Sequence, residues 1–403
     1  MDEVDIPSYF LCPISLQIMK DPVTVSSGIT YDREPIEKWI FSSKNYTCPV
    51  TRQPLSDADL TPNHTLRRLI QAWCALNSSK GIERFPTPKP PVDKAQIVKL
   101  LNEGKTLQHQ MRHLRSLRSI ANESERNRRC LESAGAVEFL ASIVTNQSSS
   151  SGSDSASDEA LYILYHLQIS EAGLKNLISR NGDFIQTLMR VLQHGSYPSR
   201  AYASLLLKCM FQLADPIYLM SLRLEHFVQI VNVLRDQISQ QASKASLQIM
   251  IDLCPWSRNR VKAVEAGAVS VLIEILLEKT EKRVCEMVLV VLNLLCGCAE
   301  GRAELLKHGA GIAVVSKKIL RVSHVATDRG VRILSSISRF TPTSFVLQEM
   351  LQVGAVSKLC LLLQVDCSPK TREKAEEMLR LHSRSWKNSS CIPVHLVPSY
   401  PSS

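Results

Sequence analysis

The chain has 403 residues, enough for two or three domains at about 100–200 residues each. Apolar residues make up 44% and charged residues 21%, while Gly and Pro are too few for a collagen-like or largely disordered protein. The formal net charge is +10 without any run of five like charges, which favours a solvated basic surface, and we expect no nucleic acid among the partners.

The N-terminus, Met1-Asp2-Glu3, is acidic, whereas a secretory leader begins with basic residues. The longest apolar run, 287–299, contains Asn293 and is short for a bilayer span. We therefore expect a cytoplasmic protein with reduced thiols, without a transmembrane segment and with a nuclear pool allowed.

The first strands should form a hairpin. Residues 23–25 and 29–31 are rich in β-prone side chains, and Gly28 lies at the corner between them, where a positive φ is needed. Asp32 follows and is placed to cap a helix that begins REPIEKWIF. This pattern predicts a hairpin joined directly to a helix.

An irregular loop is expected over 45–55 and a second short helix over about 65–76. A two-loop module of this size usually holds structural zinc. The only candidate ligands, however, are Cys12, Cys48, His64 and Cys74, with no C-x-x-C pair. We therefore expect no metal and no other cofactor. Hydrogen bonds and salt bridges should hold the loops, among them Asp21, Asp32, Arg33 and Glu37.

Two changes of composition divide the rest of the chain. The segment 80–92 carries prolines at 86, 88, 90 and 91 and predicts an extended linker. Beyond residue 386, three prolines and no helical period predict a loosely attached tail, 387–403. The domains are thus 5–79, the linker 80–92, a helical domain 93–386 and the tail.

Residues 93–386 contain an internal sequence repeat. Glycines in a similar apolar setting recur at Gly135, Gly182, Gly267, Gly309 and Gly354. They are separated by 47, 85, 42 and 45 residues. Because 85 is about twice 42, we expect a diverged unit near Glu225 within the longest interval. This period is typical of the armadillo/HEAT class, in which apolar helices such as 284–295 are buried between neighbouring repeats.

Two further features of the repeats have mainly structural interpretations. Cationic side chains stand seven residues before several repeat glycines, as Lys175, Arg128, Arg260 and Arg302. We expect the three arginines to bond a neighbouring carbonyl. The polar segment 148–158 should be a loop between helices.

The N-terminal sequence resembles a U-box, the zinc-free relative of the RING finger. The likeness is carried by IPSYFLCPISLQIMKDPVTVSSGITYDREPIEKWI, then by CPVTRQPL and LTPNHTLRRLI. With the linker and repeats, the whole chain resembles the plant U-box/armadillo E3 ubiquitin ligases, in the compact branch that dampens immune and drought signalling. The resemblance implies an α+β U-box followed by an all-α armadillo-repeat solenoid.

It also implies partners, among them a homo- or hetero-oligomer formed through the U-box, and a mechanism. A U-box docks a ubiquitin-loaded E2 enzyme, and ubiquitin passes directly to lysines of a substrate held by the repeats, without a covalent E3 intermediate. The implied E2 contacts are Ile14 and Leu16 from the first loop, Trp39 from the helix and Pro49 from the second loop. Arg52 corresponds to the cation that bridges E2 and ubiquitin.

Cys12 and Cys48 lack a neighbouring His and are interpreted as packed structural thiols, not ubiquitin acceptors. Two Thr-Pro dipeptides make Thr61 and Thr87 candidate phosphorylation sites. A phosphate at Thr61 would add about −2 charge beside Arg67 and Arg68 and alter self-association through the U-box, and with it self-ubiquitination.

Two other classes of protein compete with the ligase. One is a non-catalytic armadillo adaptor with a degenerate N-terminal module, against which the intact loop pair and Arg52 argue. The other, a nucleic-acid-binding protein, is favoured only by net charge.

Overall fold

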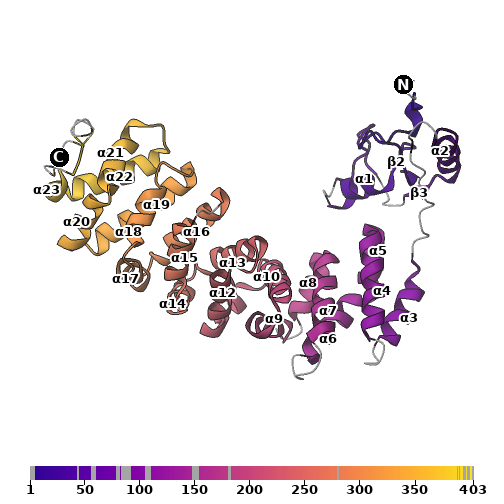
Figure 1. The fold of residues 1–403 in the computed structure, drawn as a ribbon, viewed down its shortest axis with the longest axis horizontal. Coiled ribbons are helices and arrows are strands. Elements are labelled where there is room, and N and C mark those ends of the chain that lie inside the picture. Colours follow the sequence, from indigo (N-terminus) through magenta and orange to yellow (C-terminus); the bar gives the residue numbers. More distant parts are fainter. Residues whose placement is uncertain are drawn as a thin grey trace. The chain divides into compact units, whose positions relative to one another are not determined.

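The computed structural model describes residues 5–42, 45–55, 60–78, 82, 92–104, 110–147, 154–179, 183–278, 281–387, 389, 391–393, 396 and 400–401. The chain forms two compact units, 1–136 and 137–403. Figure 1 shows the small strands confined to the N-terminal module and helices in the rest of the chain.

The N-terminal module, residues 5–78, mixes short strands and helices. Its elements are η1 (Ser8–Phe10), β1 (Pro22–Thr24), β2 (Thr30–Asp32), α1 (Arg33–Glu37), the π-helical turn η2 (Lys38–Ser42), β3 (Thr61–Pro62) and α2 (His64–Leu76). The hairpin and both helices therefore form where the sequence predicts them.

The hairpin is antiparallel, with Val23 opposite Tyr31, and Gly28 adopts the predicted positive φ of 80°. The sequence did not predict the third strand, β3, which pairs with the other side of β1 to give the order β2-β1-β3. Asn63 joins this sheet to α2, because its backbone N–H donates to Pro22 O at 2.8 Å and its side chain caps Leu66 N at 3.0 Å.

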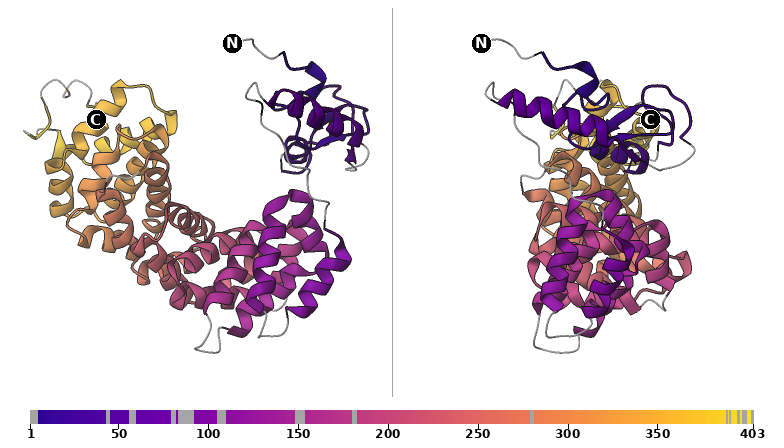
Figure 2. Two further views of the ribbon diagram at one scale, coloured as in Figure 1. Left: turned by 45° about the vertical axis from the view of Figure 1, so that its right-hand side comes forward. Right: turned by 90° about the vertical axis from the view of Figure 1, so that its right-hand side faces the viewer.

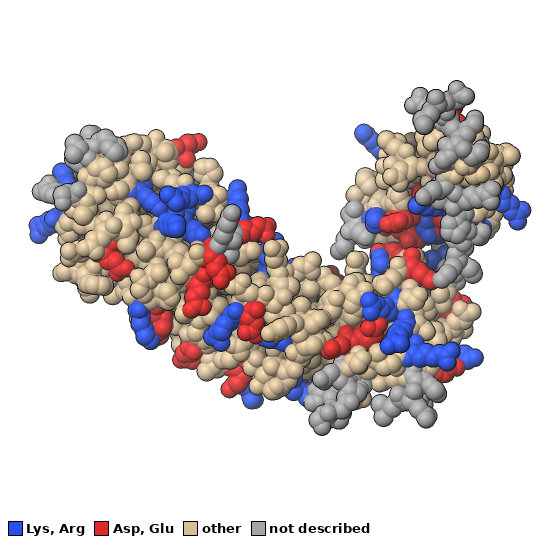
Figure 3. Space-filling view, in the orientation of Figure 1, with Lys and Arg blue, Asp and Glu red and all other residues tan. Residues whose placement is uncertain are grey.

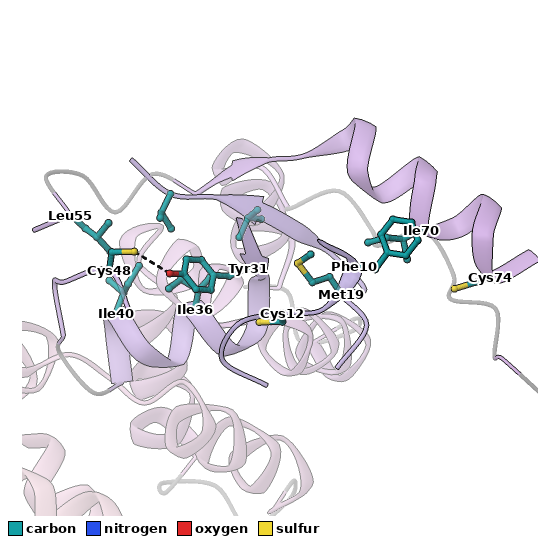
Figure 4. Close-up of a cluster of buried hydrophobic side chains, with 12 residues drawn as sticks. Phe10, Cys12, Met19, Tyr31, Ile36, Ile40, Cys48, Leu55, Ile70 and Cys74 are labelled. Atoms are coloured by element: carbon teal, nitrogen blue, oxygen red, sulfur yellow. Dashed lines mark hydrogen bonds between the residues drawn. The ribbon is translucent and has the colours of Figure 1, made fainter. Parts of the chain in front are cut away.

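The core of the module is assembled from both loops, the sheet and both helices. Figure 4 shows Tyr31 and Cys48 pointing toward each other near Ile36 and Ile40, while Phe10 and Ile70 pack together beside Met19. All of these side chains are buried. The two loops are thus packed against one apolar core.

Asp32 occupies the predicted N-cap position of α1, but its carboxylate makes no capping bond. It turns back to the first loop, where Oδ1 accepts from Lys20 N at 3.0 Å and from Asp21 N at 2.7 Å. Asp21 in turn binds Arg33 Nε at 2.5 Å, and Arg33 lies 3.7 Å from Glu37. The polar network expected to hold the loops is therefore present.

We predict that Asp32→Ala destabilises the module by about 1–3 kcal/mol, because the part-buried amide of Asp21 loses its acceptor and the exposed amide of Lys20 must bond water instead. Hydrogen exchange on the full chain would measure this as faster exchange of residues 5–78. Residues 137–403 serve as the internal control and should be unchanged. Equal protection of the N-terminal module in both proteins would show that the network does not hold the loops.

Helices form the remainder of the described chain. Their bounds are α3 (Lys94–Glu103), α4 (Gln110–Glu123), α5 (Glu125–Ser133), α6 (Ala136–Gln147), α7 (Asp154–His166), α8 (Glu171–Ser179), α9 (Asp183–His194), α10 (Tyr197–Phe211), α11 (Pro216–Ser221), α12 (Leu224–Asp236), α13 (Gln240–Leu253), α14 (Ser257–Glu265), α15 (Ala268–Leu277), α16 (Lys282–Leu295), α17 (Ala299–Lys307), α18 (Gly311–Lys318), α19 (His324–Phe340), α20 (Ser344–Gln352), α21 (Ala355–Gln364), α22 (Pro369–Leu381) and α23 (Ser383–Trp386).

Within the second unit, the last helices of successive repeats pack side by side and form a ladder. This ladder consists of α7, α10, α13, α16, α19 and α22, which follow one another in Figures 1 and 2. Apolar residues along α16, including Val288 and Leu292, are buried between its neighbours, as the sequence predicts for a stacked repeat.

Three of the repeat glycines behave as expected at the sharp turn between helices. Gly135, Gly267 and Gly354 have φ of 88°, 81° and 72°, which glycine adopts without a steric penalty. Gly309 does not share this conformation, and Gly182 lies outside the described residues. The diverged unit expected near Glu225 is present, because the short helix α11 ends at Ser221 and the longer helix α12 begins at Leu224.

Two of the repeat arginines have the structural role favoured above. Arg302 Nη1 donates to Cys296 O at 3.1 Å, and Arg128 Nη1 lies 3.4 Å from Ala121 O, each at the end of a preceding helix. Arg260 differs, because its contact is with Ser257 Oγ at 3.1 Å. Lys175 pairs with Glu171 at 3.0 Å.

Two predictions at segment ends need correction. Residues 154–158, predicted as loop, form the first turns of α7; their alternating small and acidic residues are compatible with a helix start. The tail is also better packed than its prolines indicate. Ile392, Leu396 and Tyr400 are buried, and Tyr400 Oη donates to Leu379 O at 2.6 Å.

Within the described ranges, no single helix is long and apolar enough to cross a membrane. Only α20 and α21 taken together, with a 63° bend between them, have a suitable length and composition.

Candidate functional site

The two loops of the N-terminal module are built alike. The first contains Cys12-Pro13-Ile14-Ser15-Leu16-Gln17 and the second Cys48-Pro49-Val50-Thr51-Arg52-Gln53. Leu16 N donates to Cys12 O at 2.8 Å and Arg52 N to Cys48 O at 2.9 Å. Each cysteine N–H also donates to the carbonyl of the glutamine, at 2.8 Å in both loops. The spacing C-P-x-x-x-Q occurs twice in the sequence and is the signal for this internal duplication, although it is not among the motifs singled out above.

Leu16 and Arg52 occupy the same position in their loops, and both are left-handed, with φ of 55° and 59°. L-residues other than Asn and Asp rarely adopt this conformation, because Cβ then lies too close to a carbonyl oxygen, so the backbone is strained at both positions. The Leu16 side chain is 74% exposed. Arg52 is also exposed, and its guanidinium group makes no hydrogen bond or ion pair with any residue that the structure describes. Exposed side chains on strained backbone positions of this kind are typical of binding sites.

Cysteine sulfur atoms hold the loops from inside. Cys12 Sγ accepts from Asp32 N at 3.3 Å, and Cys48 Sγ accepts from Ser27 Oγ at 3.1 Å and lies 3.0 Å from Tyr31 Oη. Burial alone would raise the pKa of Cys48, but hydrogen bonds from Ser27, Thr51 and Tyr31 outweigh it and lower the pKa to about 6. Burial raises the pKa of Tyr31, which therefore stays protonated as a donor.

These thiols are structural, as the sequence analysis favoured, because the exposed fractions of Cys12 and Cys48 are 0% and 1%. The described residues hold no group of three or more His, Cys, Asp or Glu side chains placed to bind a metal ion. The thiols instead accept hydrogen bonds at the centre of each loop.

A shallow groove of about 430 Å³ lies between the first loop and α1. Ile14 and Trp39 line it together with Pro35, and Lys20, Glu34 and Lys38 contribute charge. Lys38 Nζ binds Glu34 Oε1 at 2.8 Å and thereby lowers the pKa of Glu34. Trp39 and Pro35 share the groove because they are four residues apart on a helical segment.

Trp39 also connects the helix to the second loop, since its indole Nε1 donates to Thr47 O at 2.8 Å. Ile14 and Trp39 are half-buried against the core, whereas Leu16 projects into solvent. The structure therefore brings together two of the five residues singled out from the sequence. Leu16, Pro49 and Arg52 lie on the two loops but do not line this groove.

The first candidate phosphorylation site, Thr61, is exposed on the edge strand β3, opposite Thr24. Arg67 is already engaged, because it lies 3.6 Å from Asp21 Oδ1 and 2.9 Å from His64 Nδ1. Arg68 is exposed. The second candidate, Thr87, lies outside the described residues.

Two family models match the chain. Residues 6–79 match the model of the U-box domain, and residues 96–402 match that of the plant U-box protein ARM repeat region. The chain belongs to the plant U-box proteins with armadillo repeats. The predicted fold class, an α+β U-box followed by an armadillo-repeat solenoid, is thereby confirmed.

The U-box/armadillo chain has relatives that match over its whole length. The E3 ubiquitin-protein ligase PUB23 of Arabidopsis thaliana is 55% identical over 99% of this chain and 98% of its own. PUB22 of the same plant, also an E3 ubiquitin-protein ligase, is 52% identical over 99% of both chains. Among solved structures, an engineered protein covers 77% of this chain and 71% of its own, with 17% identity and a TM-score of 0.49.

Proposed function

We propose that the U-box of this chain docks a ubiquitin-loaded E2 enzyme on its two matched loops and promotes direct transfer of ubiquitin to lysines of a protein substrate. The observation that carries the proposal is the pair of left-handed loop positions, which present Leu16 and Arg52 to solvent beside the groove of Ile14 and Trp39. By family and by its full-length relatives, the chain is a ubiquitin transferase of the E3 class.

The apolar side chains supply the docking energy. Leu16 and Ile14 from the first loop, Pro49 from the second and Trp39 between them would bury against an apolar surface of the E2. The exposed Leu16 and the half-buried Trp39 are favourable anchors, because binding energy concentrates in a few well-packed side chains. The groove is already shaped in the free chain, so little ordering cost is paid on binding.

Arg52 would act after docking. Its guanidinium has no partner among the described side chains and stands on the second loop, at the position that Leu16 holds in the first, where it is free to bond carbonyl groups of both E2 and ubiquitin. Holding the conjugate in one orientation for an incoming lysine lowers the barrier through proximity. Cys12 and Cys48, the two cysteines of the docking loops, are too buried to accept ubiquitin themselves.

The repeat ladder would hold the client protein. The chain would also associate with itself through the U-box, and phosphorylation at Thr61 and Thr87 would regulate this association. It would act in the cytoplasm, with a pool in the nucleus.

In the plant we propose that the chain lowers immune and water-stress responses. Loss of the gene should then strengthen both responses, and unchanged responses in the loss-of-function plant would refute this role.

A ubiquitination assay with E1, a panel of E2 enzymes, ubiquitin and ATP tests the ligase. We expect a ladder of self-modified chain that depends on every component and weakens in Ile14→Ala. The matched control is Ile217→Ala, an exposed isoleucine of α11 in the repeat domain, which should retain the ladder. A folded chain that forms no ladder with any E2 would instead favour the non-catalytic adaptor.

A further inference from the structure

Basic side chains gather on the ladder of the second unit. Figure 3 shows Lys and Arg grouped over α19 and its neighbours, on the face displayed there. Two ion-pair clusters lie where α19 packs against α22, one around Asp328 and the other around Glu377. The partners of these two carboxylates show how much positive charge remains uncompensated.

The carboxylate of Asp328 is already fully engaged. Arg332 Nε contacts its two oxygens at 3.0 and 2.9 Å, and Thr371 Oγ1 of α22 donates to Oδ1 at 2.9 Å. Arg329 Nε lies 3.7 Å from Oδ2, too far for a hydrogen bond. This Nε is buried without an acceptor among the described residues, while the Arg329 side chain as a whole is 35% exposed.

Glu377 is shared in the same way. Arg339 Nη1 lies 3.2 Å from its Oε1 and Lys374 Nζ lies 3.9 Å from its Oε2. Across both clusters, four cations therefore face two carboxylates. We call this the α19–α22 basic surface, and it consists of Arg329, Arg332, Arg339, Lys374, Asp328 and Glu377.

We propose that the α19–α22 basic surface binds an acidic segment of the client protein, made of Asp, Glu or phosphorylated side chains. The inference deepens the proposed function and rests on it, because it names the chemistry of the client that the repeats hold. Half-buried guanidinium groups bind carboxylate or phosphate in charge-assisted, often bidentate bonds, which are stronger where water is partly excluded. The buried Nε of Arg329 is out of reach of a ligand, but the Nη groups of Arg329 and Arg332 make no hydrogen bond among the described residues, because Arg332 binds Asp328 through Nε alone. These Nη groups, one helical turn apart on half-exposed side chains, are the donors that we assign to the acidic segment.

Fluorescence anisotropy with the full chain tests this site. The probes are a labelled peptide of alternating Glu and Ser, its phosphoserine form and a peptide of alternating Lys and Ser. Binding is measured with wild type, Arg329→Gln and the double variant Arg329→Gln/Arg332→Gln. The control double variant, Arg258→Gln/Arg384→Gln, removes the same charge from exposed positions on α14 and α23, outside the ladder. Thermal unfolding verifies that each variant is folded.

We expect both acidic peptides to bind and the lysine peptide not to bind. Dissociation constants should rise about tenfold in the double variant and less in Arg329→Gln, with no change in the control. A larger effect on the phosphoserine form would identify phosphate as the preferred group. Equal affinity of wild type and double variant, binding of the lysine peptide, or binding of anionic vesicles or DNA but not of peptides would overturn the proposal.

Self-ubiquitination separates this inference from the function on which it rests. The double variant lies far in sequence from the U-box loops and should form the same ladder as wild type. If neither wild type nor any variant forms a ladder, the ligase proposal fails. The peptide titration still shows whether the α19–α22 basic surface binds an acidic segment.

Discussion

Arg52→Asn is expected to slow self-ubiquitination by about ten- to a hundredfold while leaving E2 affinity nearly unchanged. Charge-assisted hydrogen bonds contribute about 1.5–3 kcal/mol each, and this variant removes the donors that would bridge E2 and ubiquitin. Asn tolerates the left-handed conformation that Arg52 adopts at φ 59°, so the loop itself should persist. The initial rate of ladder formation at saturating E2 measures the effect.

Two further variants isolate the role of the guanidinium. Arg52→Lys keeps the charge but not the planar fork, and its rate should fall between wild type and Arg52→Asn. Arg68→Gln removes an exposed arginine from α2 in the same module and should retain the wild-type rate. If Arg52→Asn and Arg68→Gln are equally active, Arg52 is an ordinary surface side chain.

Leu16→Asn should weaken E2 binding by at least about tenfold without lowering the stability of the U-box. A docking anchor contributes about 2 kcal/mol or more when it is buried in the complex. In the free chain Leu16 is 74% exposed, so its removal costs no core packing, and Asn suits the left-handed position at φ 55°. Titration of the full chain with E2 measures the affinity, and thermal unfolding measures the stability.

Leu76→Asn is the matched control, because Leu76 is 81% exposed on α2 and lies outside both loops. It should bind E2 as wild type does. An unchanged affinity in Leu16→Asn would remove the first loop from the docking surface, and a loss of stability would show that Leu16 belongs to the core instead.

Local sequence signals were sufficient for the hairpin, the helices and the repeats. Gly28 marks a turn that needs a positive φ, and the glycines at 135, 267 and 354 mark equivalent turns in the repeats. Such positions are set by backbone sterics over a few residues and can be recognised directly from the sequence. The strand at Thr61–Pro62 was missed, since two residues carry no period and their pairing with β1 depends on tertiary contacts.

The candidate site was only partly predictable for the same reason. Asp32 has the sequence position of a helix cap, but its carboxylate bonds Lys20 N and Asp21 N across the fold. The left-handed backbone at Leu16 and Arg52 likewise has no composition signal, because neither residue type favours it. Only the repeated C-P-x-x-x-Q spacing could have revealed that the two loops match.

Discharge of a preloaded E2–ubiquitin thioester onto free lysine, without E1 or ATP, tests direct transfer most simply. The account predicts that the chain speeds loss of the thioester at least about tenfold, that Arg52→Asn does not, and that non-reducing gels show no ubiquitin thioester on the chain. Discharge that is unchanged by the folded chain, or a thioester formed on one of its cysteines, would contradict it.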